Sequence, residues 1–220
     1  MYLSRLELNV RRHETMRLMV SPQVMHSAIM ASFPSFEGGT DRVLWRVDNL
    51  GPSTYVIVQS EKSPDFQHMV DQFGWPASGQ RWDTLNYDQF LDNINNSQIW
   101  RFRLAANPVH SVGIPSQKGR RGKVLAHVTA DQQKKWLLDR ASKFGFSIMD
   151  ATSDVREPAL EIKQRETKQF SREDRRVTFS AVTFEGILKV EDADLMVDSM
   201  KRGIGRAKGY GCGLLTVARM

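Results

Sequence analysis

Alternating apolar and polar residues mark the predicted strands in the first half of the chain. Residues 2–9 alternate in this way and predict a half-buried strand. Residues 43–47 and 54–59 are apolar runs separated by Asp, Asn, Gly and Pro, which predicts two strands joined by a turn. Residues 100–106 predict a fourth strand, with polar positions on one of its faces.

Two helices fit between these strands. Ser21 followed by Pro22 is a helix-start signal, and apolar residues then recur at three- and four-residue spacing to Phe33. Residues 64–73 predict the second helix, and residues 74–98 predict a loop with one helical turn. The first half therefore has the βαββαβ order of a ferredoxin-like domain.

The second half repeats this order without repeating the sequence. Its predicted elements are a strand at 123–128, a helix at 130–143, strands at 144–149, 160–168 and 175–189, a helix at 191–202 and a strand at 214–217. We therefore expect an α+β protein with two tandem ferredoxin-like (RRM-like) domains. Their expected bounds are 1–110 and 122–220, joined by a linker at 111–121 that is rich in Pro, Gly and basic residues.

Charge separates the two halves. Residues 1–110 contain 10 Lys and Arg against 11 Asp and Glu, whereas residues 111–220 contain 21 against 14. A basic half indicates a polyanionic partner, most simply a nucleic acid. The single cysteine, Cys212, excludes an internal disulfide and fits a reducing, cytoplasmic setting. No apolar run approaches the roughly 20 residues that span a membrane, so we expect no membrane association.

Glycines crowd the segment just before the last strand. They lie at positions Gly203, Gly205, Gly209, Gly211 and Gly213. Arg202, Arg206 and Lys208 flank them, and backbone N–H groups next to cations suit a phosphate-bearing ligand. The order helix, loop, strand and the Lys at position 208 do not match a P-loop or a dinucleotide fingerprint, so no nucleotide cofactor is expected. A turn that only packs closely against other elements stays open as an alternative.

Further cations gather in the linker and in the predicted hairpin. The candidate polyanion contacts there are Lys118, Arg120, Arg121, Arg156, Lys163, Arg165, Lys168, Arg172 and Arg175. Acidic residues between them leave a second interpretation, in which a solvated hairpin pairs opposite charges across its strands.

His26 is the best candidate for proton transfer. It lies with Gln23 off the apolar stripe of the first helix, and an imidazole of ordinary pKa, about 6.5, exchanges protons near neutrality. The five histidines show no metal-ligand spacing, so no metal is expected. A lone surface histidine without any role remains the alternative.

Several segments together resemble the CasE family, the CRISPR RNA-processing endoribonucleases of the type I-E Cascade complex. The two most specific are Arg-Phe-Arg-Leu-x-Ala-Asn-Pro at 101–108 and Gly-Ile-Gly-Arg-Ala-Lys-x-x-Gly-Cys-Gly-Leu-Leu at 203–215. Supporting segments are Met-Tyr-Leu-Ser at 1–4, Ser-Pro-x-x-x-His at 21–26, Val-Leu-Trp-Arg-Val at 43–47, Val-Gln-Ser at 58–60 with Pro-Asp at 64–65, Ala-His-Val at 126–128 and Phe-Glu-Gly-x-Leu at 184–188.

The resemblance implies two ferredoxin-like domains and metal-independent cleavage of repeat RNA at the 3′ base of its stem-loop. The 2′-hydroxyl attacks the adjacent phosphate and leaves a 2′,3′-cyclic phosphate and a 5′-hydroxyl. It also implies that the product stays bound as part of Cascade, whose other subunits are then partners; we expect a monomer when the protein is isolated.

The resemblance assigns His26 to the family's histidine. Some members place a tyrosine three residues earlier, where this chain has Gln23, which can form hydrogen bonds but cannot exchange a proton. His26 then acts alone or with Tyr210 as a second donor. Two other functions remain open: a subunit that binds repeat RNA without cutting it, and a ferredoxin-like protein that binds a small nucleotide.

Overall fold

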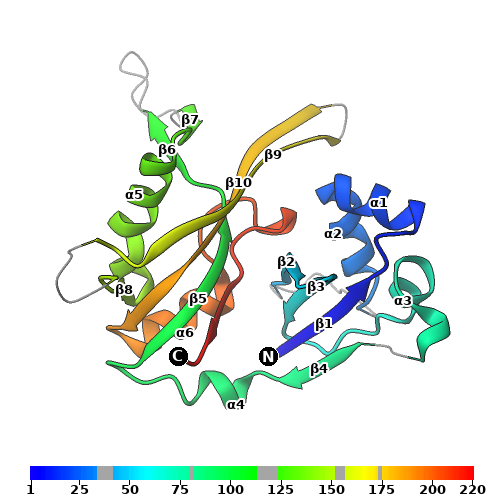
Figure 1. Ribbon diagram of the computed structural model, residues 1–220, viewed down its shortest axis with the longest axis horizontal. Helices are drawn as coiled ribbons and strands as arrows, with labels where there is room; N and C mark the ends of the chain where they lie inside the picture. Colours follow the sequence, from blue (N-terminus) through cyan, green and yellow to red (C-terminus); the bar gives the residue numbers. More distant parts are fainter. Residues whose placement is uncertain (34–41, 80–81, 113–122, 152–156, 173–174) are drawn as a thin grey trace.

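Two antiparallel sheets lie side by side in the protein, each with its own helices (Figure 1). The computed structural model describes residues 1–33, 42–79, 82–112, 123–151, 157–172 and 175–220. Within these residues, no helix is both long enough and apolar enough to cross a membrane.

The first unit has the strand order of a ferredoxin-like domain. Its elements are β1 (Tyr2–Leu8), α1 (His13–Val20), α2 (Pro22–Met30), β2 (Leu44–Leu50), β3 (Ser53–Ser60), α3 (Gln67–Phe73), the short 3₁₀ helix η1 (Pro76–Ser78) and β4 (Asp83–Asn86). The sheet order is β2-β3-β1-β4, with every neighbouring pair antiparallel. Inward residues of β1 and β3, such as Leu6 and Val56, pack against Met25 and Ile29 of α2 and Met69 of α3. This packing fixes α2 against the sheet.

The second unit has the same order. Its elements are β5 (Ile99–Ala106), β6 (Val109–Val112), β7 (Lys123–Ala126), α5 (Ala130–Ala141), η2 (Ser142–Phe144), β8 (Phe146–Ile148), β9 (Leu160–Arg172), β10 (Arg175–Val190), α6 (Ala193–Arg202), η3 (Lys208–Tyr210) and β11 (Leu215–Ala218). The sheet runs β11-β5-β10-β8, and β9 also pairs with β10. β8 and β9 follow each other along the chain and both pair with β10. Counted as one strand, they give the second sheet the same strand order as the first. The expected α+β class with two tandem ferredoxin-like units is confirmed.

The assignment of residues 99–106 to the first sheet is wrong. β5 pairs with β10 and β11, and its inward side chains Trp100, Phe102 and Leu104 join the core formed with α5 and α6. The fourth strand of the first sheet is instead β4, whose four residues are all exposed. An apolar pattern predicts a strand but not its neighbours. The two sheets therefore divide between Asn86 and Ile99, and not at the expected linker 111–121.

The strand expected to open the second unit also has a different place. Within the described residues β7 pairs with β6 alone, so these two strands form a separate small sheet inserted between β5 and α5. The side chains of β7 are all exposed. A strand that buries no face cannot start a sheet that packs on helices, and β5 takes that position.

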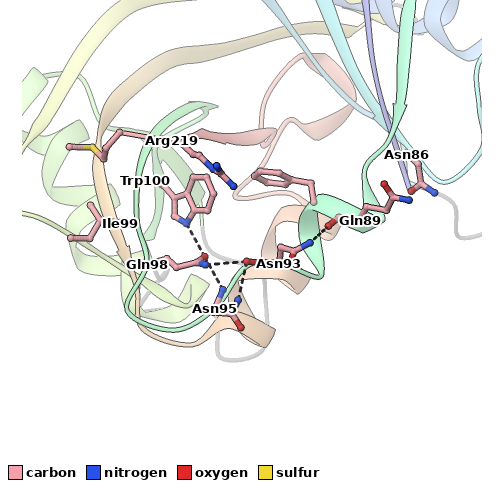
Figure 2. Close-up of a pocket in the computed structure, with 10 residues that line it drawn as sticks. Asn86, Gln89, Asn93, Asn95, Gln98, Ile99, Trp100 and Arg219 are labelled. Carbon is pink, nitrogen blue, oxygen red and sulfur yellow. Dashed lines mark hydrogen bonds between the residues drawn. The ribbon is translucent and has the colours of Figure 1, made fainter.

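The connection between the sheets is held by side-chain amides. It contains α4 (Asp88–Leu91) and borders a pocket of about 830 Å³ (Figure 2). Gln98 accepts a hydrogen bond from Trp100 Nε1 at 3.2 Å, while its own Nε2 donates to the carbonyl of Asn93 at 3.1 Å. Asn95 Nδ2 donates to the same carbonyl at 3.0 Å. These bonds order the segment that leads into β5.

Candidate active site at the domain junction

A buried arginine joins the two units. Arg46 on β2 is 4% exposed and donates five hydrogen bonds. Two go to the carboxylate of Asp48, at 2.7 and 2.8 Å. The other three reach the second unit, at the carbonyls of Arg103 and Leu214 and the hydroxyl of Thr216, at 3.1, 2.9 and 2.9 Å. Because β11 directly follows the glycine-rich loop, Arg46 fixes one end of that loop against the first unit.

The glycine-rich loop, residues 203–213, packs against the same edge strand. Gly203 has φ +76° and Gly211 has φ +82°, a region that favours glycine. A Cβ on Gly203 would lie 2.7 Å from the Leu44 side chain, and one on Gly211 would lie 2.9 Å from the ring of Trp45. Close packing therefore explains two of the five glycines, as the alternative interpretation of this loop expected.

The same loop reaches the candidate catalytic histidine. A Cβ on Gly209 would lie 3.7 Å from Cε1 and Nε2 of the His26 ring, so the backbone passes directly beside the imidazole. Ser21 caps α2 by accepting a hydrogen bond from the backbone N–H of Val24 at 3.4 Å, and Pro22 occupies the first turn. His26 and Gln23 are both half-buried and lie one turn apart, so the sequence prediction that groups them is compatible with the helix.

Tyr210 anchors the loop to the long hairpin β9–β10. Its ring centroid lies 4.7 Å from that of Phe170 on β9 and 6.0 Å from that of Phe179 on β10. Both phenylalanines are buried and form a small core with Cys212. The half-buried Tyr210 ring thus has a packing role, whatever its hydroxyl does.

The three cations in and beside the glycine-rich loop have different environments. Arg202 is exposed and pairs with Asp198 at 2.8 Å, one helical turn earlier. Arg206 is exposed. Lys208 is half-buried and its Nζ donates to the carbonyl of Arg202 at 2.7 Å. Burial, with smaller contributions from Arg42 and Arg202, lowers the pKa of Lys208. A partly desolvated ammonium next to two guanidinium groups is a favourable place for an anion.

The cations of the hairpin do not share one face. Lys168 pairs with Glu166 and lines the cleft beside Tyr210, whereas Arg165 donates to the carbonyl of Val128. Lys163 pairs with Glu161. Among the described residues of the hairpin these opposite charges pair along β9, and not across the strands as the second interpretation of the hairpin held.

The structure describes only some of the remaining candidate cations of the hairpin and the linker. Arg175 is exposed where the hairpin turns, and it stands opposite Arg172 in the strand register. Lys118, Arg120, Arg121 and Arg156 lie outside the described residues, as does the side chain of Arg172.

A cleft of about 170 Å³ lies between the two units and reaches Met25, the residue before His26. It is lined by residues of α1 and α2, of the edge strand β2, of β5, of the hairpin and of the glycine-rich loop: Met19, Pro22, Met25, Trp45, Arg46, Val47, Asn49, Ala105, Gln164, Glu166, Lys168, Ala181, Thr183, Tyr210 and Gly211. In the described part of the chain, no three or more His, Cys, Asp or Glu side chains are grouped as metal ligands.

Sequence reasoning missed the junction itself. Arg46 and Asp48 are two residues apart on a strand and therefore share a face, and both are buried. A pair of opposite charges within an otherwise apolar strand was a usable signal that this edge of the sheet meets another part of the protein. The local sequence pattern did not indicate that Arg46 bonds to β5 and β11.

Comparison with known proteins agrees with this architecture. The profile of a family described as "CRISPR associated protein" matches residues 1–219. The "CRISPR-associated endoribonuclease Cse3" of Thermus thermophilus is 28% identical over 228 residues, covering 99% of this chain and 100% of the relative. The "CRISPR system Cascade subunit CasE" of Escherichia coli is 28% identical over 117 residues, 53% of this chain and 56% of the relative.

The structural similarity extends over the whole chain. The structure of Thermus thermophilus Cse3 "bound to an RNA representing a pre-cleavage complex" has a TM-score of 0.78 and 26% identity, covering 99% of this chain and 98% of the other. The family profile covers nearly the whole chain, and the strand order agrees with the structural match. The chain therefore belongs to the CRISPR-associated protein family, and it resembles Cse3 over its whole length and CasE over about half of it.

Proposed function

We propose that this protein is an endoribonuclease that cleaves CRISPR repeat RNA at the 3′ base of its stem-loop. One observation carries the proposal: His26 lies against the glycine-rich loop at the junction of two ferredoxin-like units. The similarity to a full-length relative named as an endoribonuclease, and to its RNA-bound structure, supports the same activity.

The reaction that fits these residues is an internal transesterification. The 2′-oxygen forms a bond to phosphorus, the bond from phosphorus to the 5′-oxygen breaks, and one proton moves overall from the 2′-hydroxyl to the leaving oxygen. The products are a 2′,3′-cyclic phosphate and a 5′-hydroxyl. Because the nucleophile belongs to the substrate, the reaction requires proton transfer and charge stabilisation but no metal-bound water. His26 is the proton-transfer group, and Lys208 and Arg206 supply positive charge at the phosphate.

Gln23 and Tyr210 have supporting parts in this proposal. Gln23 lies one turn before His26 and orients RNA or the imidazole through its amide. The Tyr210 ring is held by Phe170 and Phe179, so it keeps the glycine-rich loop in place beside His26. After cleavage the product stem stays on the hairpin and the loop, and the protein joins Cascade at the 3′ end of its RNA.

Replacement of His26 tests the catalytic assignment. We expect His26→Ala to bind a cognate repeat hairpin within a few-fold of the wild type and to cleave it at least about a hundredfold more slowly. Single-turnover cleavage in EDTA and filter binding measure the two quantities. His13→Ala is the matched control, because His13 is exposed on the neighbouring helix α1.

Other outcomes would favour the other functions. Tight binding without cleavage by the wild-type protein would indicate a subunit that only binds repeat RNA. Binding that hardly changes with salt would point to a small nucleotide ligand, because contacts to an RNA backbone weaken steeply as salt is added. Near-normal cleavage by His26→Ala would remove His26 from the mechanism.

A further inference from the structure

The cleft between the two units has the size of one small aromatic ring. Its volume is about 170 Å³. An engineered protein cavity of about 150 Å³ is known to take up benzene, so a space of this kind accommodates a single six-membered ring rather than a helix or a whole nucleotide. The cleft is therefore suited to one side group of a polymer whose backbone stays outside.

The walls of the cleft combine apolar surface with hydrogen-bonding groups. Met25, Val47 and Ala181 provide apolar contact, and the aromatic residues Trp45 and Tyr210 also line the space. Trp45 is 4% exposed, and its indole N–H has no hydrogen-bond partner within the described residues. Apolar and aromatic surface with a few polar groups is how proteins hold a base that has left its stack.

The polar groups come from the hairpin. Gln164, Glu166, Lys168 and Thr183 line the cleft from β9 and β10. Glu166 accepts a hydrogen bond from Gln164 Nε2 and pairs with Lys168, so an acceptor and a cationic donor stand together. Cytosine presents its amino group beside an acceptor, and a carboxylate is the usual acceptor for that amino group. The preference for a pyrimidine over a purine comes from the volume of the cleft, which fits one ring.

The position of the cleft connects it to the cleavage site. Met25 and Tyr210 line it, and each is the immediate neighbour of one of the two residues that meet at the candidate site, His26 and Gly209. A base in the cleft therefore lies close to the place where His26 and Gly209 meet.

We propose that this cleft binds one unpaired pyrimidine of the RNA, next to the scissile phosphate, and so selects the cleavage register. The inference rests on the proposed function, because it assigns a base to the RNA that this function requires. Glu166 and Lys168 read the edge of the base, while Trp45 and Tyr210 contact its ring.

The test combines an abasic scan with a variant of the cleft. Repeat RNAs that each lack one base, at successive unpaired positions flanking the cut, are cleaved by the wild type and by Glu166→Gln. We expect one abasic position, a pyrimidine in the natural repeat, to slow the wild type at least tenfold. Glu166→Gln should cleave the intact RNA at least tenfold more slowly than the wild type does. Removing the base at the sensitive position should slow this variant by less than a further twofold.

The control and the contrary outcomes separate this inference from the proposed function. Glu161→Gln makes the same change on the same strand outside the cleft and should cleave all RNAs like the wild type. Equal losses in the wild type and Glu166→Gln at every position, or full activity with a purine at the sensitive position, would overturn the base site while cleavage itself persists. No cleavage of any repeat by the wild type would instead overturn the proposed function.

Discussion

The domain junction and the long hairpin both depend on arginine and lysine, but they use these residues in opposite ways. At the junction, Arg46 is 4% exposed and all its bonds are to the protein. On the hairpin, Arg165 and Lys163 are exposed, and their partners are a nearby carbonyl and a neighbouring carboxylate. The first kind of cation fixes the position of His26 relative to the loop, and the second kind remains accessible to a ligand.

This contrast predicts which property each region controls. A buried charge that loses its partner is left without water or counter-charge, so damage at the junction costs folding free energy. An exposed pair is screened by solvent and contributes little to stability. Changes at the junction should therefore affect stability and cleavage, and changes on the hairpin should affect RNA affinity.

The largest effect is expected for Arg46→Met. Removing the guanidinium leaves Asp48 buried without its main partner, and we expect a loss of about 3–5 kcal/mol in the free energy of unfolding, measured by urea denaturation. Arg165→Met on the hairpin is the matched control and should change stability by no more than about 0.5 kcal/mol. Adding Asp48→Leu to Arg46→Met should recover part of the loss. Similar losses of unfolding free energy in Arg46→Met and Arg165→Met would contradict the contrast between the buried junction and the exposed hairpin.

A smaller loss is expected for Gly211→Ala. The added methyl group meets the Trp45 ring at 2.9 Å and the residue has φ +82°, so we expect about 1–3 kcal/mol of destabilisation and a larger decrease in cleavage rate than in RNA affinity. Gly51→Ala controls for backbone strain alone, because Gly51 has φ +62° and open space around it. If Gly51→Ala costs as much, the contact with Trp45 does not matter.

The hairpin should control salt dependence, and its two faces should differ. Lys168 lines the cleft and Arg165 does not. We expect Lys168→Ala to reduce the slope of log affinity against log salt by about one, because it removes a cation that stands beside the bound nucleotide, and Arg165→Ala to reduce the slope by clearly less. Equal slopes for both variants would show that the RNA does not discriminate between the faces.

The smallest effect is expected for Glu161→Gln. This change removes the ion-pair partner of Lys163, and both side chains are exposed. The free energy of unfolding should hardly change in low salt and should change even less in high salt, where surface pairs are screened. A loss comparable to that of Arg46→Met would mean that surface pairing holds the hairpin in place.

Local pattern predicted most strands and helices but not how the sheets divide. The alternation in β1 and the cap at Ser21 are signals that belong to a few consecutive residues, and both elements occur close to their expected bounds. β5 shows the limit: its apolar face identifies a strand, yet its partners β10 and β11 lie far along the chain. β4 has four exposed residues and therefore gave no pattern at all.

The candidate site was predictable to a similar extent. The glycine spacing and the position of His26 pointed to two segments of interest, and the fold places them in contact. No functional importance was predicted for Arg46 and Trp45, which belong to one of the segments that resemble the family. Their importance depends on contacts with the other unit, which the local sequence does not indicate. The sequence also did not predict which hairpin side chains share a face. The register of β9 against β10 shifts between Thr183 and Phe184, and this shift changes which positions of β9 point the same way.

The small core beneath the hairpin also provides the protein with an internal chemical reporter. Cys212 is the chain's only cysteine, it is fully buried beside Phe170 and Phe179, and burial raises the pKa of its thiol to about 12. The thiolate is the form that attacks an alkylating reagent, so at mildly alkaline pH such reagents should modify Cys212 only when the hairpin separates from the glycine-rich loop. The rate of labelling, with and without RNA, therefore measures how often this contact opens, in the natural sequence and without an added probe.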